Sequence, residues 1–261
     1  MTLEIREFQH NDIEQVANLL ALLWGGDKQS NKIMLQWKYF DLKPFNITTA
    51  YVGLDNHEII GFRGYFPSFW GNGTSLLRVL TPSDAVVAPK FRRKGFFSSL
   101  TTYSIKALET YHDLFLNTSS NTQSVPGYLK LSWKKLCARD FVYKIFKFRV
   151  SNDFYIRDSE EIMVLDSISF EDITHLLKVK KATGYQQTFT KEYFEWRYNR
   201  PFRNYVFVLL TTNSSSNALL VLERSNQGRV LDYYDLNQNY SGIKRIIKHI
   251  RANSSISSLK A

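Results

Sequence analysis

The stretch "VVAPKFRRKGFFSSL", residues 86–100, constrains the fold of this chain more than any other segment. It starts as an apolar run typical of a strand, passes through a proline and three consecutive cations, and reaches a glycine. After the glycine, apolar residues recur at helical spacing. The stretch therefore predicts a strand that leads through a short basic turn into an amphipathic helix, which is typical of an α/β architecture.

The basic turn has the chemistry of an anion-binding site. The first turn of a helix leaves backbone N–H groups unpaired and carries a partial positive charge. Gly95 lets phosphate oxygens approach the backbone, and Arg92, Arg93 and Lys94 add positive charge. The turn lacks the Gly-Lys-Ser/Thr of a P-loop and the Gly-x-Gly of a dinucleotide fingerprint. By itself, a charge run of this kind is more often a solvated surface, so this alternative stays open.

The rest of the first 150 residues continues the alternation of strand and helix patterns. A short strand near residue 3 leads to a helix that Asn11 or Asp12 begins and Gly25 ends. A hairpin with its turn at "LDNHE", a further strand, and two later helical segments follow. The order β-α-(α)-β-β-β-α-β-α-β predicts a mixed α/β fold, with a sheet flanked by helices.

Composition limits the class of protein. The chain has 261 residues and a formal net charge of +10, which favours an anionic partner such as nucleic acid, a membrane surface or a phosphate-rich small molecule. No apolar run reaches the ~20 residues of a membrane span, and the N-terminus lacks a secretory h-region. Cys137 is the one cysteine, which excludes an intramolecular disulfide and a cysteine zinc cluster. We expect a cytoplasmic protein without a bound metal.

Two segments of the first half recur in the second half in the same order. "LQWKYFDLKPF" (35–45) is echoed by "FEWRYNRPF" (194–202), and "RVLTPSD" (78–84) by "RVLDYYD" (229–235). Two ordered echoes predict a duplicated unit. We therefore expect one domain at residues 1–150 and a partial, degenerate copy at residues 151–261, because "NQNYSGIKR" (237–245) lacks the basic start of the first copy.

Two motifs resemble those of a known superfamily. "VAPKFRRKGFF" resembles the coenzyme A signature of the GNAT N-acetyltransferases, with Phe97 in place of its last small residue. "NTQSVPGYLKLSW" is similar to the superfamily's second motif, with Ser132 and Trp133 in place of glycine and phenylalanine. The residues that match are Val87, Pro89, Phe91, Arg92 and Gly95 in the first motif, and Asn121, Ser124 and Tyr128 in the second.

The resemblance implies a GNAT fold, with acetyl-CoA as co-substrate, and a role for each matched position. The backbone of Ala85, Val86 and Val87 is expected to pair with the pantetheine arm like an added strand. Backbone amides are expected to hold the pyrophosphate along Arg92, Arg93, Lys94, Gly95, Phe96 and Phe97. Asn121 is expected to contact the coenzyme, and Tyr128 to protonate the leaving thiolate, although a tyrosine packed on a helix face would fit the same position.

The general base is less defined by the sequence. Asp84 precedes the expected coenzyme strand and is a candidate base, but an aspartate after Thr-Pro-Ser is equally typical of a turn. His10 and His57 lie in polar segments and are expected to be solvated. Cys137 has no apparent partner histidine, so a buried structural thiol is the simpler expectation.

These features together predict an N-acetyltransferase that acts on a primary amine. The "WKY…P" segment beside such a fold resembles acetyltransferases associated with bacterial polysaccharide biosynthesis, which implies an amino sugar, with or without a linked nucleotide, as acceptor. One alternative is a catalytically inactive GNAT-like module that binds acyl-CoA or another ligand, suggested by Phe97 and Ser132. A nucleic-acid-binding protein, suggested by the charge, is a second and weaker alternative. The oligomeric state is left open.

Overall fold

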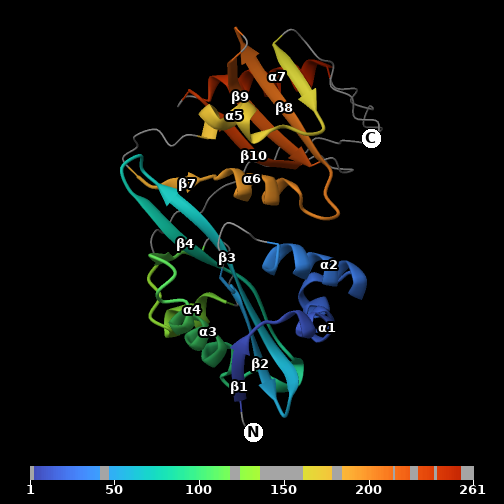
Figure 1. Cartoon of the computed structure of the whole chain (residues 1–261), viewed down its shortest axis with the longest axis vertical. Helices are drawn as coiled ribbons and strands as arrows, with labels where there is room; N and C mark the ends of the chain where they lie inside the picture. Colours follow the sequence, from blue (N-terminus) through green and yellow to red (C-terminus); the bar gives the residue numbers. More distant parts are fainter. Residues whose placement is uncertain are drawn as a thin grey trace, which may run out of the picture. The chain divides into compact units, whose positions relative to one another are not determined.

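A computed structural model describes residues 3–41, 47–117, 124–135, 161–177, 184–213, 215–223, 229–237 and 240–253 (Figure 1). The chain forms two compact units: Met1–Arg139 with Val179–Pro201, and Asp140–Lys178 with Phe202–Ala261. The sequence suggested a single division after residue 150, whereas the structure places residues 179–201 with the first unit. The last strand in the order expected from the sequence, at "ARDFVYKIFKFRVS" (138–151), lies outside the described residues.

The sheet of the first unit has β1 (Leu3–Glu7), β2 (Ala50–Asp55), β3 (Glu58–Gly71), β4 (Leu76–Val87) and β5 (Leu114–Phe115) in that order. The first four strands are antiparallel, and β5 runs parallel to β4. A short strand, β7 (Gln186–Thr188), pairs with the end of β3. The mixed sheet expected from the sequence is therefore confirmed.

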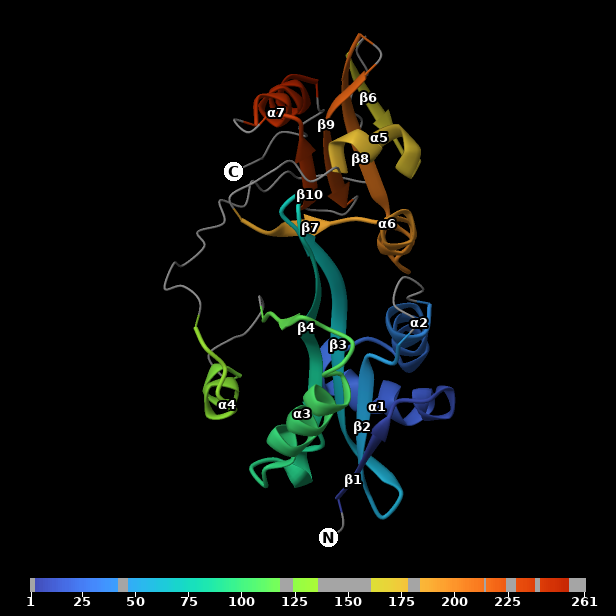
Figure 2. The same ribbon diagram turned by 60° about the vertical axis from the view of Figure 1, so that its left-hand side comes forward.

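Helices cover both faces of this sheet. On one face lie α1 (Ile13–Trp24) and α2 (Lys28–Tyr39), and on the other lies α3 (Phe96–Ala107), as Figure 2 shows. The core beneath α1 and α2 includes Val16, Leu20 and Leu35 packed on Val52 and Phe62. The core beneath α3 is built from Tyr51, Tyr65, Leu80, Leu100 and Leu108. Helix α4 (Val125–Lys130) follows β5, and one-turn 3-10 segments precede α1 (His10–Asp12) and α3 (Pro89–Phe91).

Helix α6 (Lys191–Tyr198) joins the first unit through its contact with α2. Trp37 and Trp196 stack with ring centroids 4.6 Å apart and ring planes 5° from parallel. Each indole N–H donates to the other tryptophan's backbone carbonyl, at 3.0 and 2.8 Å. The two tryptophans occupy the same place in the two echoed segments, and their contact is reciprocal.

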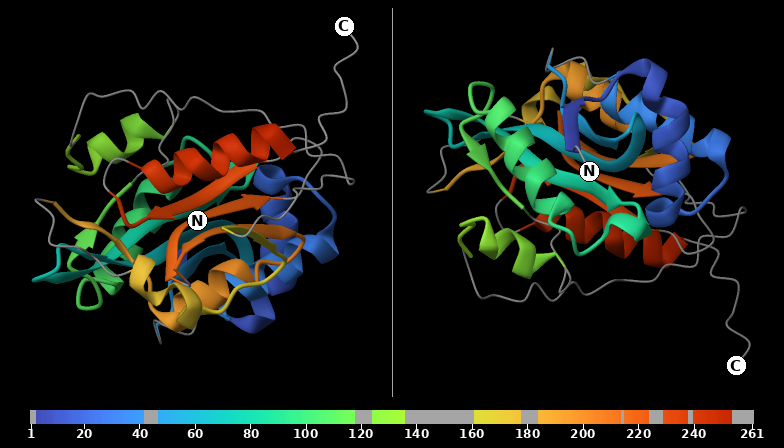
Figure 3. Two further views of the ribbon diagram at one scale, coloured as in Figure 1. Left: turned by 90° about the horizontal axis from the view of Figure 1, so that it is seen from above. Right: turned by 90° about the horizontal axis from the view of Figure 1, so that it is seen from below.

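The second unit has a four-stranded antiparallel sheet in the order β6 (Ile162–Leu165), β8 (Tyr205–Thr212), β9 (Ser215–Glu223) and β10 (Arg229–Asp235). Ile243, Ile246 and Ile250 of α7 (Ser241–Asn253) pack on one face of this sheet. Helix α5 (Phe170–Leu177) lies on the other side (Figure 3, left). In both units four antiparallel strands follow one another across the sheet in chain order, and a helix follows the last of them.

Candidate active site

Strand β4 is paired along one edge, and among the described residues it is open along part of the other. On the paired edge, Ala85, Val86 and Val87 lie opposite Arg63, Phe62 and Gly61 of β3. On the other edge, β5 pairs only with Val79 and Leu80. Within the described part of the chain, no strand pairs with this edge from residue 81 onward. An open strand edge is a template on which an extended ligand can form backbone hydrogen bonds.

The open edge leads into the start of α3, which none of the described side chains caps. Gly95 precedes the helix with φ = 85°, and Arg93 also has a positive φ of 62°. Only glycine adopts such a φ readily, which explains the glycine at this turn. The amides of Phe96, Phe97 and Ser98 point out of the first turn without an intrahelical acceptor. These donors stand beside the exposed cations predicted from the sequence: Arg92, Arg93 and Lys94.

Arg92 differs from the other two cations of the turn. Its Nε donates to the backbone carbonyl of Val87 at 3.0 Å, so the side chain fastens the turn to the end of β4. Lys94 holds its ammonium 5.5 Å from the ring centroid of Phe91. Arg93 and Lys94 are therefore the side chains best placed to add charge to the amides of α3.

Tyr128 is buried at 7% exposure and faces β3 and α3. Its hydroxyl oxygen accepts a hydrogen bond from Nη2 of Arg63 at 2.6 Å. The rings of Phe97 and Trp133 flank it, with centroids 5.8 and 4.9 Å from that of Tyr128. Because the tyrosine oxygen accepts from Arg63, the hydroxyl hydrogen is left to donate elsewhere.

Arg63 is a buried cation that the sequence analysis missed. It is 1% exposed, and its guanidinium carbon lies 4.9, 5.6 and 5.4 Å from the ring centroids of Tyr65, Phe97 and Tyr128. Burial alone would lower the pKa of Arg63, but the oxygens of Tyr65 and Tyr128 raise it above its ordinary value. The side chain thus stays charged. The available signal was that Arg63 is the single charged residue between Glu58 and Arg78 in the sequence.

The departures from the superfamily's motifs have local explanations. Phe97 replaces a small residue and turns its ring toward Tyr128 and Arg63. Ser132 replaces a glycine and has φ = 63°, in the left-handed region that favours glycine. Trp133 contacts the rings of Tyr128 and Phe115. The substituted residues therefore shape the surroundings of Tyr128.

Asp84 lies on β4, but its partners come mainly from α1 and α2. Lys38 Nζ and the Tyr39 hydroxyl donate to Oδ2 at 2.6 Å each, and Trp24 Nε1 donates to Oδ1 at 3.0 Å. Ser83 Oγ adds a longer bond of 3.3 Å. Burial would raise the pKa of Asp84, but Lys38 and the other donors hold it below its ordinary value. Asp84 is therefore an ionised carboxylate whose two oxygens are both engaged, by partners other than Tyr128.

A pocket of about 280 Å³ is lined in part by Ser83, the residue before this aspartate. It combines aromatic walls with hydroxyl, amide and guanidinium groups. The described residues that line it are Phe66, Ser68, Trp70, Thr81, Pro82, Ser83, Gln187, Tyr193 and Arg197. These residues come from β3, β4, β7 and α6, all within the first unit. Sequence patterns contained no sign of the pocket, because β7 and α6 lie about 100 residues after β4.

Four further residues that the sequence singled out are Asn121, Cys137, His10 and His57. Asn121 and Cys137 lie outside the described residues. His57 is exposed in the hairpin turn, as expected, and the ring of His10 stacks on Phe40. Groups of three or more histidine, cysteine, aspartate or glutamate side chains able to hold a metal are absent from the described residues. The helices of that same part of the chain are too short or too polar to cross a membrane.

Comparison with known proteins gives matches among solved structures only. No family model and no curated protein matches the sequence. A conserved protein of unknown function from Enterococcus faecalis V583, named "Probable N-Acyltransferase", is 10% identical with a TM-score of 0.66, over 97% of this chain and 64% of its own. A GCN5-related N-acetyltransferase from Anabaena variabilis ATCC 29413 is 11% identical with a TM-score of 0.63, over 96% and 63%.

These matches establish the fold. The chain has the GNAT acyltransferase fold, as the sequence resemblance predicted. It spans a little under two thirds of each of those two structures. At 10% and 11% identity the likeness concerns the fold and leaves the activity to be argued from the site.

Proposed function

We propose that this protein is an N-acetyltransferase that transfers an acetyl group from acetyl-CoA to a primary amine. One observation carries the proposal: the open edge of β4 continues into the glycine-started first turn of α3, whose amides meet no side-chain cap among the described residues. A strand edge suits the amide groups of a pantetheine arm, and a bare helix start suits a pyrophosphate. The two features follow each other in the order in which the two parts occur in coenzyme A.

The coenzyme contacts follow from this arrangement. Ala85, Val86 and Val87 offer backbone groups to the pantetheine arm. The amides of Gly95, Phe96 and Phe97, with Arg93 and Lys94 nearby, bind the pyrophosphate. Arg92 has a mainly structural part, since its Nε already bonds to Val87. Asn121 remains a predicted coenzyme contact from the motif.

Tyr128 is proposed as the general acid. A primary amine attacks a thioester directly, so the protein has to orient the reactants and manage two protons. When the carbon–sulfur bond breaks, sulfur takes the electron pair and needs a proton. The Tyr128 hydroxyl, whose oxygen already accepts from Arg63, has its hydrogen available for that transfer.

The sequence suggested Asp84 as the general base, but its surroundings fit a structural role. A base needs a free lone pair and a proton affinity near the working pH. Asp84 has both oxygens bonded and a lowered pKa. We therefore assign it to holding α1 and α2 on β4, and we expect the amine to lose its proton to solvent.

We propose the pocket beside Ser83 as the acceptor site. The partly exposed ring of Trp70 offers apolar contact to a sugar, while Ser83 and Gln187 offer polar groups that can form hydrogen bonds with its hydroxyl groups. Arg197 is suited to an anionic substituent. An amino sugar, with or without a linked nucleotide, fits this chemistry, whereas a polycationic amine would meet an arginine and no acid among the described lining residues. An association with polysaccharide biosynthesis remains a prediction from the sequence.

We also propose that the second unit is a degenerate copy that does not bind coenzyme. Its strand order and following helix repeat those of the first unit. At the start of α7, however, Oδ2 of Asp235 accepts from the amide of Ile243 at 2.9 Å. At the start of α7, a carboxylate of the protein itself thus occupies the position that corresponds to the proposed anion site at the start of α3.

The decisive experiment compares Tyr128→Phe with the wild type. General acid catalysis contributes ~10²–10⁴-fold, so we expect kcat to fall by about that factor with little change in acetyl-CoA affinity. Thiol release with a panel of amino sugars and calorimetry with acetyl-CoA provide the two measurements. Tyr103→Phe, at an exposed tyrosine of α3, is the matched control and should behave like the wild type.

Two results would count against the proposal. If Tyr128→Phe keeps more than about a third of kcat, Tyr128 is not the acid. If the wild type fails to bind acetyl-CoA at ~1 mM, a concentration above typical substrate KM values, the inactive-module alternative is favoured. Binding of nucleic acid that weakens steeply with salt would support the remaining alternative.

A further inference from the structure

Arg63 is unusual because it is buried and has no carboxylate partner in the described part of the chain. Its side chain is 1% exposed, in the middle of β3. One nitrogen, Nη2, donates to Tyr128. The other two, Nε and Nη1, are buried and have no hydrogen-bond partner among the residues that the structure describes.

Such an arrangement is a poor way to stabilise a fold. A buried charge loses its hydration, and each buried donor without an acceptor adds to that loss. The three aromatic rings around the guanidinium recover part of it through cation–π contacts. An apolar side chain of similar length would pack in the same cage without the penalty, and Met is well suited to contact aromatic rings. This balance points to a function for the charge.

We propose that Arg63 is a positioning residue for Tyr128: it fixes the hydroxyl so that its hydrogen faces the coenzyme sulfur, and it stabilises the negative charge that proton donation leaves behind. The inference rests on the proposed function and adds to it a residue outside the superfamily motifs that the sequence matched. Phe97 belongs to the same arrangement, because its ring lies against the guanidinium and meets the tyrosine ring edge to face.

The proton and electron pairs balance in this scheme. The amine nitrogen bonds to the thioester carbonyl carbon, and the carbon–sulfur bond breaks with its electron pair on sulfur. The Tyr128 proton moves to sulfur, and the phenolate oxygen remains 2.6 Å from the Arg63 Nη2 position. The amine loses one proton to solvent, and solvent returns one proton to Tyr128.

The first test is a double-mutant cycle with Arg63→Met, Tyr128→Phe and the double variant. We expect Arg63→Met to lower kcat ~10–10²-fold, with less than about a three-fold change in the KM for acetyl-CoA. In the Tyr128→Phe background, the same change should alter kcat less than about three-fold, because the two residues act as one unit. Arg63→Lys, which keeps the charge, should recover part of the loss.

Stability separates this role from a structural one. We expect the melting temperature of Arg63→Met to equal or exceed that of the wild type, since the variant removes a buried charge with unpaired donors. Ser104→Ala is the control, at a buried residue on the same face that bonds to the Tyr65 hydroxyl. It should keep the kcat of the wild type. Multiplicative effects of Arg63→Met and Tyr128→Phe on kcat would overturn the proposal.

A second measurement needs no acceptor. Free CoA is titrated into the protein by calorimetry near pH 8 in two buffers of different ionisation enthalpy, which reports the protons released on binding. If Arg63, acting through Tyr128, stabilises negative charge on the coenzyme sulfur, the CoA thiol loses protons when it binds to the wild type. Arg63→Met should then release about half as many protons or fewer. Desulfo-CoA, which has no thiol, should release none from either protein.

The outcomes distinguish the two proposals. Equal proton release by the wild type and Arg63→Met overturns the role of Arg63 and leaves the acetyltransferase proposal standing. A wild type that does not bind CoA overturns both. A wild type that binds CoA with Arg63-dependent proton release, but acetylates no amine tested, supports the role of Arg63 and rejects the proposed acceptors.

Discussion

At the scale of single residues, Gly64 shows how one missing side chain shapes the site. It lies in the β-bulge of β3 opposite the segment that holds Asp84. A Cβ added to Gly64 would overlap the hydroxyl of Tyr39. That hydroxyl donates to Asp84, so the glycine is required by space and not by its backbone dihedrals.

Gly64→Ala should therefore destabilise the fold. The new methyl group displaces Tyr39 and breaks its bond to Asp84, and overpacking of a core costs about 1–3 kcal/mol. Urea unfolding of the purified variant measures this change in the free energy of unfolding. Gly53→Ala on β2, where an added Cβ meets only ordinary contacts, is the control. If the two substitutions lower the free energy of unfolding equally, the contact with Tyr39 is not the reason for a glycine at position 64.

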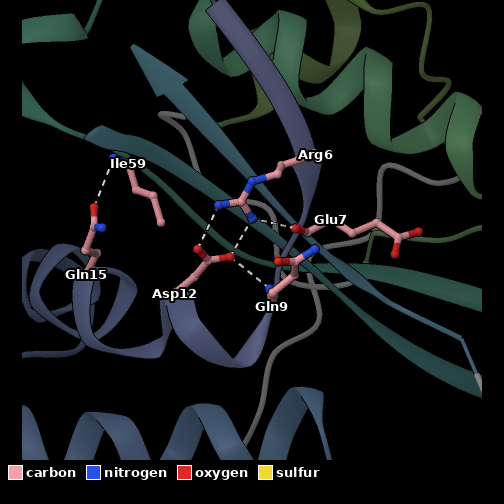
Figure 4. A network of polar contacts seen from close by, with 6 residues as sticks. All are labelled: Arg6, Glu7, Gln9, Asp12, Gln15 and Ile59. Atoms are coloured by element: carbon pink, nitrogen blue, oxygen red, sulfur yellow. Dashed lines mark hydrogen bonds and ion pairs between the residues drawn. The ribbon is translucent and has the colours of Figure 1, made fainter. Parts of the chain in front are cut away.

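At the scale of elements, a partly buried ion pair ties β1 to the start of α1 (Figure 4). Arg6 donates to both carboxylate oxygens of Asp12, at 2.6 and 2.8 Å, and the amide of Gln9 donates at 2.9 Å. Burial would raise the pKa of Asp12, but these donors hold it below its ordinary value. Gln15 of α1 also accepts a hydrogen bond from the amide of Ile59 in β3.

This pair predicts the response of the protein to acid. Because the folded pKa of Asp12 lies below its unfolded value near 3.8, its contribution is complete above that pH and is lost as pH falls through the folded pKa. Asp12→Asn should reduce the free energy of unfolding by about 1–3 kcal/mol at pH 7, and the gap should narrow below about pH 4. Denaturant unfolding between about pH 3 and 7 checks this. Glu109→Gln, at an exposed site, should show no such trend, and a constant gap for Asp12→Asn would refute the assignment.

At the scale of the whole molecule, two similar sheets differ in the helix that follows them. The first turn of α3 has no side-chain cap from the described residues, whereas Asp235 supplies a carboxylate to the first turn of α7. A carboxylate at a helix start repels a phosphate and uses the amide that would bind it. We therefore expect the two units to differ in their capacity to bind an anion, although their strand order is the same.

We accordingly expect one coenzyme per chain. Calorimetric titration with CoA should give a single site, and Arg93→Ala with Lys94→Ala should weaken binding by about 1.5–3 kcal/mol for each charged side chain that is removed. Asp235→Ala, in contrast, should leave this affinity unchanged. Two coenzymes bound per chain would reject the view that the second unit is degenerate.

Much of the fold was predictable from local sequence. The run from β4 into α3 is specified by an apolar strand, a glycine with a left-handed φ and a helical repeat, all within 15 residues. Tyr128 on a short helix after β5 was also predicted. The duplicated unit suggested by the two echoed segments stays a prediction. Each of these features depends on local backbone preferences or on the spacing of residues along the chain. Both can be read from the sequence without knowledge of the tertiary fold.

Other properties were decided only when distant segments came together. The sequence presented Arg63 as one cation in an apolar strand, and packing placed it against Tyr128, 65 residues away. It presented Asp84 as a candidate base, and packing provided donors from α1 and α2. The pocket exists because α6 and β7 join a sheet formed some 100 residues earlier. Charge, burial and hydrogen bonding of a side chain depend on its neighbours in space, and those neighbours are set by the tertiary fold.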